Sequence, residues 1–252
     1  MNFSKLNKKN FKNSKMKFSK KNYINLLKVI KKNYRFICAS NWHKYKRNIK
    51  YAILRHDIDF DTSLALQMAK IEKIKNIKAN YFFLLRDDFY DLFSIETSKN
   101  IKLISNLGHN IGLHINPLTY QFEKDPRRAL KRDIKYFENF YEIKINSISY
   151  HQPSIHSFSK INLKLKFNSY DPKVMSSYKY FSDSSMRFRW HEFNDVLKNN
   201  MNIQLLIHPI WWLTDNLKIE SKLREVYELK KVNIKMKFKN YNKILGIKNN
   251  YN

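Results

Sequence analysis

Short apolar runs alternate with amphipathic segments along most of this chain. The runs typical of strands are 51–54, 80–85, 110–113, 145–150, 180–181 and 203–207, and the segments with helical periodicity are 23–32, 63–74, 94–107, 126–140 and 192–198. Strands that alternate with helices are typical of βα units. The sequence therefore predicts an α/β domain with a parallel sheet that is closed or nearly closed.

Nearly every predicted strand ends on a titratable or polar side chain. The residues at these ends are Asp57 and Asp59, His114, His151, Asp183 and His208. In a barrel of parallel strands, all carboxyl ends lie on one face, where active sites are built. Five separate segments are therefore expected to bring carboxylates and imidazoles to one mouth.

Asp57 and Asp59 are the first pair of residues that indicates a catalytic or metal-binding site. They are two residues apart on an extended segment, so their side chains leave the same face. Two buried carboxylates repel each other, and a divalent cation relieves the repulsion while one of them acts as a base. The alternative is a pair of strand-end caps or surface acids.

The segment Gly108-His-Asn-Ile-Gly-Leu-His114 holds two of the three glycines in the chain. Glycine is expected where the backbone turns or comes close to another group. The position of His114 at a strand end predicts a metal ligand. His109 is expected to be structural, at the turn between helix and strand.

His208 follows an apolar strand and precedes Pro209-Ile-Trp-Trp212. A histidine at a strand end near a metal is a good general acid, because its pKa lies near neutral pH. Trp211 and Trp212 are expected either to form a platform on which a sugar ring stacks or to pack in the core.

The composition sets outer limits on function. The net charge is +28, but lysine is spread through every segment and greatly outnumbers arginine. We therefore expect no specific nucleic-acid partner, although peripheral contact with an anionic membrane or glycan is consistent with this charge. Cys38 is the single cysteine, and no apolar run approaches the length of a membrane span. These features predict a cytoplasmic protein.

The predicted organisation is one barrel domain between two basic ends. Residues 1–22 are rich in Lys, Asn and Ser, without the apolar stretch of a secretory signal, and we expect a mobile basic leader. Residues 23–230 are assigned to the barrel. Residues 231–252 are assigned to a basic C-terminal tail. The sequence predicts no oligomeric state.

The motifs resemble those of a known family. Leu54-Arg-His-Asp-Ile-Asp59, Ala79-Asn-Tyr-Phe-Phe83 and the Gly108–His114 segment are similar to the first two motifs of the polysaccharide deacetylases (carbohydrate esterase family four, the NodB-homology domain). Later similarities are Tyr150-His-Gln-Pro-Ser154, Tyr180-Phe-Ser-Asp-Ser184 with Arg187-Phe-Arg-Trp190, and Leu206-Ile-His-Pro209 with Trp211-Trp212. They resemble most closely a bacterial branch of surface-polysaccharide biosynthesis proteins, and they occur in the expected order.

The resemblance implies a distorted (β/α)7 barrel of the TIM type that binds one divalent metal, usually zinc. By position, Asp57 is similar to the family's catalytic base, Asp59 and His114 to metal ligands, and His208 to the catalytic acid. The implied reaction removes an N- or O-linked acetyl group from a sugar or polysaccharide precursor. Gln152, Asp183 and Trp211 are expected to contact this substrate.

Two positions depart from the family pattern. The family has a second histidine four residues after the first, where this chain has Leu118, and an arginine that orients the base, where this chain has Gln152. His151 is expected to be the missing metal ligand, or else it faces the substrate. The alternative function is a catalytically degenerate barrel that binds glycan or supports polysaccharide assembly.

Overall fold

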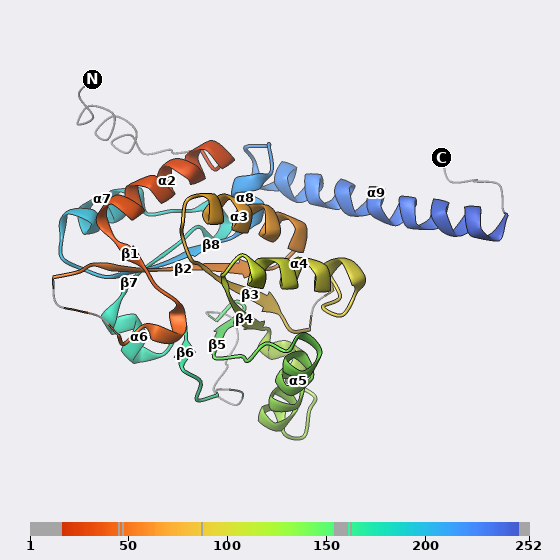
Figure 1. The fold of residues 1–252 in the computed structure, drawn as a ribbon, viewed down its shortest axis with the longest axis horizontal. Helices are drawn as coiled ribbons and strands as arrows, with labels where there is room; N and C mark the ends of the chain where they lie inside the picture. The colour runs from red at the N-terminus through yellow and green to blue at the C-terminus, as the bar shows by residue number, and fades with distance from the viewer. Residues whose placement is uncertain are drawn as a thin grey trace.

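The computed structural model describes residues 17–44, 46, 48–86, 88–153, 161 and 163–246. In this part of the chain, parallel strands form one curled sheet in the order β6-β5-β4-β3-β2-β8-β7, and β1 pairs with the first residues of β2 (Figure 1). The strands are β1 Arg35–Phe36, β2 Tyr51–Ile58, β3 Asn80–Leu84, β4 Asn110–Ile115, β5 Ser147–Tyr150, β6 Phe167–Asn168, β7 Lys179–Ser182 and β8 Ile203–Ile207.

Helices connect the strands and cover the sheet. They are α2 Lys20–Asn33, α3 Thr62–Ile74, α4 Ile95–Asn106, α5 Pro126–Tyr141, α6 Pro172–Ser177, α7 Trp190–Lys198, α8 Pro209–Leu213 and α9 Ile219–Leu245. Short 3-10 turns are η1 Ala39–Asn41, η2 Pro117–Tyr120 and η4 Ser184–Met186. The predicted distorted (β/α)7 barrel of a single domain is confirmed. Its sheet is a half-barrel with β6 and β7 at the two edges.

Local signals set where the helices begin and end. The Asp61 side chain accepts hydrogen bonds from the backbone N–H groups of Ser63 and Leu64, which caps α3. Asp125 caps α5, and Pro126 lies in its first turn. After α4, Gly108 has φ of +92°, a conformation that favours glycine and that stops the helix where expected.

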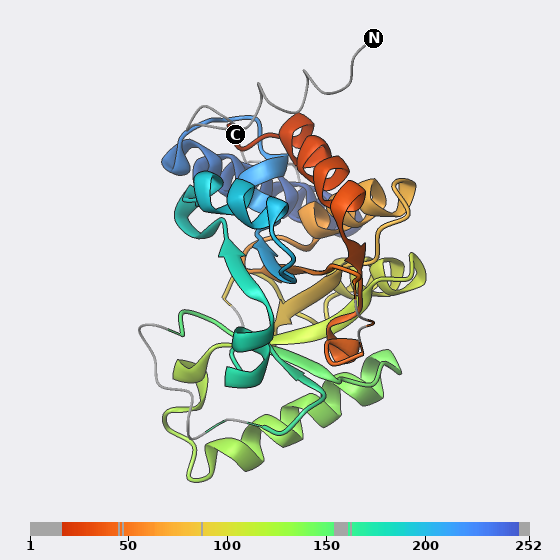
Figure 2. The same cartoon turned by 90° about the vertical axis from the view of Figure 1, so that its left-hand side faces the viewer.

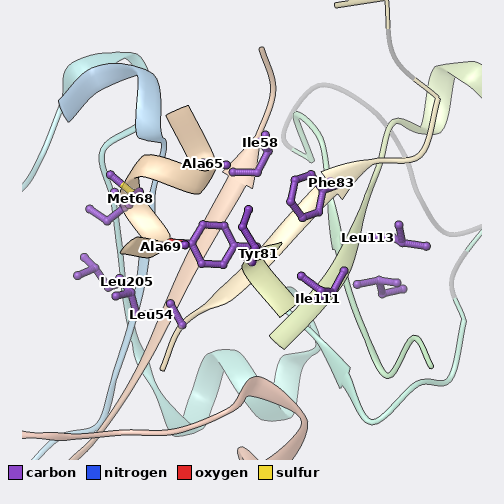
Figure 3. Close-up of a cluster of buried hydrophobic side chains, with 14 of the residues drawn as sticks. Leu54, Ile58, Ala65, Met68, Ala69, Tyr81, Phe83, Ile111, Leu113 and Leu205 are labelled. Atoms are coloured by element: carbon purple, nitrogen blue, oxygen red, sulfur yellow. The ribbon is translucent and has the colours of Figure 1, made fainter. Parts of the chain in front are cut away.

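The core between the sheet and α3 is formed by apolar side chains from both layers (Figure 3). Leu54 and Tyr81 on the strands are fully buried against Met68 on α3. Each buried side chain of this size stabilises the fold by about 1.5–3 kcal/mol. The same packing holds β2, β3 and β4 side by side, so it also aligns their carboxyl ends.

Gly112 lies where two strands come too close for a side chain. A Cβ atom there would be 2.6 Å from the Phe82 ring and 2.9 Å from the Ser147 backbone oxygen. The prediction that this glycine marks a close approach is therefore confirmed. With a side chain at position 112, β4 could not lie between β3 and β5 at this spacing.

Several elements differ from the sequence-based expectation. Strand β2 continues through the acidic cluster to Ile58, and β4 includes His114. The boundary placed at residue 230 falls inside α9, which continues to Leu245, and the boundary at residue 22 falls inside α2. Residues 1–16 and 247–252 of the predicted leader and tail lie outside the described residues.

The end of α9 extends well beyond the rest of the molecule (Figure 1). Figure 2 shows α2, α7 and α9 grouped at one end of the molecule and α5 at the other. Among the described residues, no helix is both long enough and apolar enough to cross a bilayer.

Candidate active site

The carboxyl ends of the central strands meet at a cavity of about 1160 Å³. Seven of the eight predicted site residues line it: Asp57, Asp59, His114, His151, Gln152, His208 and Trp211. They come from β2, β4 and the segments that follow β2, β5 and β8, so the expected convergence on one face of the sheet is confirmed.

Asp57 is held by an arginine from its own strand. Arg55 donates from Nε to Oδ1 at 2.8 Å and from Nη2 to Oδ2 at 2.6 Å, and both side chains are buried. Such a paired contact is among the strongest that a carboxylate makes. Burial favours the protonated acid, but the Arg55 charge outweighs it and holds the pKa of Asp57 well below its usual range. Asp57 is therefore ionised at neutral pH.

His114 is fixed by a hydrogen bond on one side of its ring. Its Nδ1 lies 2.7 Å from Ser149 Oγ, and Ser149 Oγ lies 3.4 Å from Asp57 Oδ1. Burial lowers the pKa of His114 to about 4. The ring is therefore neutral at pH 7, and its Nε2 is directed toward Asp59.

Asp59, His114 and His151 form a cluster with the geometry of a metal site. Each offers one ligand atom, and these atoms lie within 4.8 Å of one another. His114 Nε2 is 3.4 Å from Asp59 Oδ1 and 3.2 Å from His151 Nδ1. This is the set of three ligands that the sequence predicts. Leu118, at the position of the family's second histidine, is exposed on η2.

These three residues fit a divalent cation. Asp59 Oδ1 is buried and has no hydrogen-bond partner among the described residues, although two imidazoles lie beside it. Two imidazole nitrogens 3.2 Å apart need a proton or a cation between their lone pairs. Two nitrogens and one carboxylate oxygen are also a ligand set that zinc takes, with a further position left open.

His208 is oriented by Asp183. The Asp183 carboxylate accepts hydrogen bonds from His208 Nδ1 at 2.5 Å, from the His208 backbone N–H, and from Trp212 Nε1 at 2.7 Å. Burial disfavours the charged imidazole, but Asp183 outweighs it and raises the pKa of His208 to about 9. His208 Nε2 faces the cluster, 3.7 Å from Asp59 Oδ2.

The expectation that Asp183 contacts the substrate needs correction. Asp183 is fully buried and does not line the cavity, because its carboxylate is occupied by His208 and Trp212. Asp183 lies on the side of His208 away from the cavity and hydrogen-bonds its Nδ1. Trp212 is likewise a core residue, packed against Phe18 and Tyr23.

Gln152 and Trp211 both line the cavity. Gln152 is exposed at the cavity wall with φ of +47°. Trp211 lines the cavity, and its buried Nε1 has no hydrogen-bond partner among the described residues, so this donor is available to a ligand.

Sequence reasoning missed two residues of the site, Arg55 and Ser149. The family resemblance puts the residue that orients the base at position 152, where this chain has Gln152. In the structure, Arg55 makes the contact with Asp57 instead. The period of two along a strand was the signal: residues 55 and 57 share one face of β2, and Ser149 lies two residues before His151, which follows β5.

No family model matches this sequence, and no curated protein matches it. Solved structures of similar outline include a Streptococcus pyogenes deacetylase in complex with acetate, with 15% identity, a TM-score of 0.48, and coverage of 89% of this chain and 92% of that one. The Xyl-CE4 domain of a multidomain xylanase, from the hindgut metagenome of Trinervitermes trinervoides, has 13% identity, a TM-score of 0.46 and coverage of 74% and 85%.

A Bacillus anthracis pseudoenzyme of family CE4 has 14% identity, a TM-score of 0.43 and coverage of 73% of this chain and 63% of that one. The similar structures are thus named as deacetylases or as members of carbohydrate esterase family 4. At 13–15% identity, the likeness concerns the fold and not the activity of this chain.

Proposed function

We propose that this protein is a metal-dependent hydrolase that removes an N- or O-linked acetyl group from a sugar or a polysaccharide precursor. One observation supports this most: an ionised carboxylate, an Asp-His-His cluster and an oriented imidazole line the same cavity. These are a base, a cation site and an acid, the three groups that a metal-dependent acetyl hydrolysis uses.

In this proposal, Asp59, His114 and His151 hold one divalent metal, zinc being the best match to their ligand atoms. When bound, such an ion polarises a carbonyl and lowers the pKa of a water molecule. The remaining steps belong to the chain. Asp57 accepts a proton from the attacking water, and Arg55 keeps the carboxylate in position.

His208 completes the reaction as the acid. Its Nε2 faces the cavity, while Nδ1 donates to Asp183, so the proton on Nε2 is the one available to the leaving amine or alkoxide. Protonation of the leaving group and cleavage of its bond to the acetyl carbon release acetate. We further propose that Gln152 and Trp211 contact the sugar, as their places in the cavity wall allow.

We also propose the setting in which this activity operates. The motif set most closely resembles deacetylases of surface-polysaccharide biosynthesis, so a precursor of such a polymer is the proposed substrate. A peripheral contact with an anionic membrane is proposed through α9, whose residues 229–245 contain six lysines and no acidic residue. The cytoplasmic location stays a prediction.

Metal content tests the function. We expect the purified protein to contain about one zinc, cobalt or nickel ion per chain, and Asp59→Ala and His114→Ala to lose it. His191→Ala is the matched control, because His191 is exposed on α7 and does not line the cavity. Elemental analysis of the dialysed variants measures the outcome. A chain that binds no metal under any of these conditions contradicts the proposal.

Acetate release tests the chemistry separately. Asp57→Asn should retain the metal and lose most acetate release from acetylated sugars, because an amide cannot accept the proton. A metal-loaded wild-type protein that releases no acetate from N- or O-acetylated sugars would instead support the degenerate, glycan-binding barrel.

A further inference from the structure

We propose that the turn after β7 binds a phosphate group of the substrate, so that the acetylated sugar is a sugar phosphate ester. This inference rests on the proposed function, since it names the class of substrate for the same cavity. The binding group consists of Ser182, Ser184, Ser185 and Arg187, which we call the phosphate turn.

The phosphate turn belongs to the wall of the active-site cavity. All four of its residues line the cavity that also contains Asp57, Asp59 and His208. It begins at Ser182, the last residue of β7, and Asp183, which hydrogen-bonds His208, lies within it in sequence. A ligand held at this turn is therefore held beside the reacting groups.

Arg187 is the available cation of this wall. Three arginines line the cavity, and two of them are engaged: Arg86 pairs with Glu123 and Asp133, and Arg189 pairs with Glu192. Among the residues that the structure describes, no carboxylate lies within ion-pair distance of Arg187, and its side chain is exposed to the cavity. An arginine with its five N–H donors unpaired is suited to an anionic oxygen.

The backbone of the turn adds further N–H donors to those of Arg187. Ser185 is left-handed with φ of 53° and ψ of 34°, and Met186 follows with φ of 54°. Non-glycine residues seldom adopt this conformation, and they concentrate at binding turns. Successive backbone N–H groups in such a turn can face one concavity and bind an anion.

The serine hydroxyls complete the set. Ser182 Oγ and Ser184 Oγ are 2.6 Å apart, and the Ser184 backbone N–H donates to Ser182 Oγ at 3.0 Å. Hydroxyls that rotate, an arginine fork and backbone N–H groups together offer more donors than the two oxygens of a carboxylate need. A phosphate, with more oxygens and greater charge, matches this set better.

Calorimetry with three probes tests the proposal: N-acetylglucosamine, its 1-phosphate and its uridine diphosphate ester. We expect the metal-loaded protein to bind the phosphate-bearing probes at least about tenfold more tightly than the free sugar. Arg187→Gln should remove that advantage and leave affinity for the free sugar unchanged. Arg187→Lys should keep only part of it, because lysine lacks the fork.

Arg128→Gln is the matched control, since it removes the same charge from an exposed site on α5, outside the cavity. Equal gains from the two phosphate-bearing probes support recognition of the phosphate alone. A larger gain from the nucleotide supports a nucleotide-linked precursor. Equal affinity for all three probes, or an Arg187→Gln protein that keeps the phosphate advantage, overturns the proposal.

The binding readout does not depend on turnover, so it separates this inference from the proposed function. If phosphate probes bind through Arg187 but none of the three releases acetate, the phosphate turn is supported and the hydrolase proposal fails for these sugars. If acetate is released equally well from the free sugar and the phosphate esters, and their affinities are equal, the hydrolase stands and the phosphate turn does not.

Discussion

At the scale of single residues, the site depends on side chains that hold other side chains. Arg55 hydrogen-bonds Asp57, Ser149 hydrogen-bonds His114, and Asp183 hydrogen-bonds His208. Each pair comes from the period of two along a strand or from the edge where neighbouring strands end. The reacting atoms are thus positioned by buried partners that a substrate need not touch.

Arg55→Lys tests this positioning role. Lysine keeps the positive charge but cannot make two parallel hydrogen bonds, so Asp57 loses its fixed orientation. We expect kcat for acetate release to fall about 10- to 100-fold, with KM and metal content nearly unchanged. Steady-state kinetics and elemental analysis measure both, with Arg35→Lys, an exposed site, as the control. An unchanged kcat would show that Arg55 serves only the fold.

At the scale of elements, a buried ionic cluster ties four of them together behind the active site. Glu72 of α3 lies 2.6 Å from His56 of β2 and 2.6 Å from Tyr81 of β3, and it accepts a hydrogen bond from Tyr23 of α2. His109, before β4, lies 3.6 Å from the same carboxylate. His56 precedes Asp57, and its Nδ1 hydrogen-bonds the Ile207 carbonyl, so the cluster joins β2, which carries Asp57, to β8, which His208 follows.

The cluster predicts how stability depends on pH. Burial favours the protonated form of Glu72, but His56 outweighs it and lowers the pKa of Glu72 below 4.5. The folded pKa is then lower than the unfolded one, so this stabilisation is present above about pH 4.5 and is lost as pH falls through the folded pKa.

Glu72→Gln measures that contribution. Its free energy of unfolding should be about 3–5 kcal/mol lower than that of the wild type at pH 7, because His56 loses its partner. The difference should shrink as the pH falls below 4.5. Denaturant titrations at several pH values test this, and a difference that stays constant or widens in acid contradicts it.

Gly112→Ala tests the close approach of β4 to its neighbours. The new Cβ would meet the Phe82 ring at 2.6 Å and the Ser147 backbone oxygen at 2.9 Å. We expect a loss of about 1–3 kcal/mol in the free energy of unfolding, since strand spacing leaves little room to relax. Thermal unfolding detects this as a lower Tm. An unchanged Tm would mean that the strands separate at no cost.

At the scale of the whole molecule, α9 distinguishes this chain from a compact barrel. Its last turns extend past the body (Figure 1), and they expose large apolar side chains between lysines. Ile234, Phe238, Tyr241 and Leu245 recur at helical spacing, and each is more than half exposed. Two such lysine-rich helices repel each other, so an anionic surface suits α9 better than a second copy of the chain.

Vesicle binding tests the membrane contact. The protein should sediment with vesicles that contain phosphatidylserine and not with phosphatidylcholine alone. Replacing Ile234, Phe238 and Leu245 with serine keeps the charge, so it should remove the binding that persists at about 0.5 M salt while weak binding at low salt remains. Equal salt resistance in the two proteins would assign the binding to general charge and exclude α9 as a membrane helix.

The sequence by itself determined the class of fold and the residues that gather at one mouth. Periodicity located the central strands and most of their helices, and the polar strand ends predicted that Asp59, His114 and His151 meet at one mouth. These predictions succeeded because hydrophobic period and chain order are local properties, and parallel strands place their carboxyl ends together without further information. The same reasoning placed Gly108 and Gly112 correctly.

Only the tertiary structure decided which group serves which. Asp183 is a strand-end acid in the sequence, but the fold places it behind His208, where three donors occupy its carboxylate. Trp211 and Trp212 are adjacent in sequence, yet one lines the cavity and the other packs in the core. Orientation and burial arise from contacts between distant segments. The residues that line the cavity were therefore predictable, whereas their hydrogen-bond partners were not.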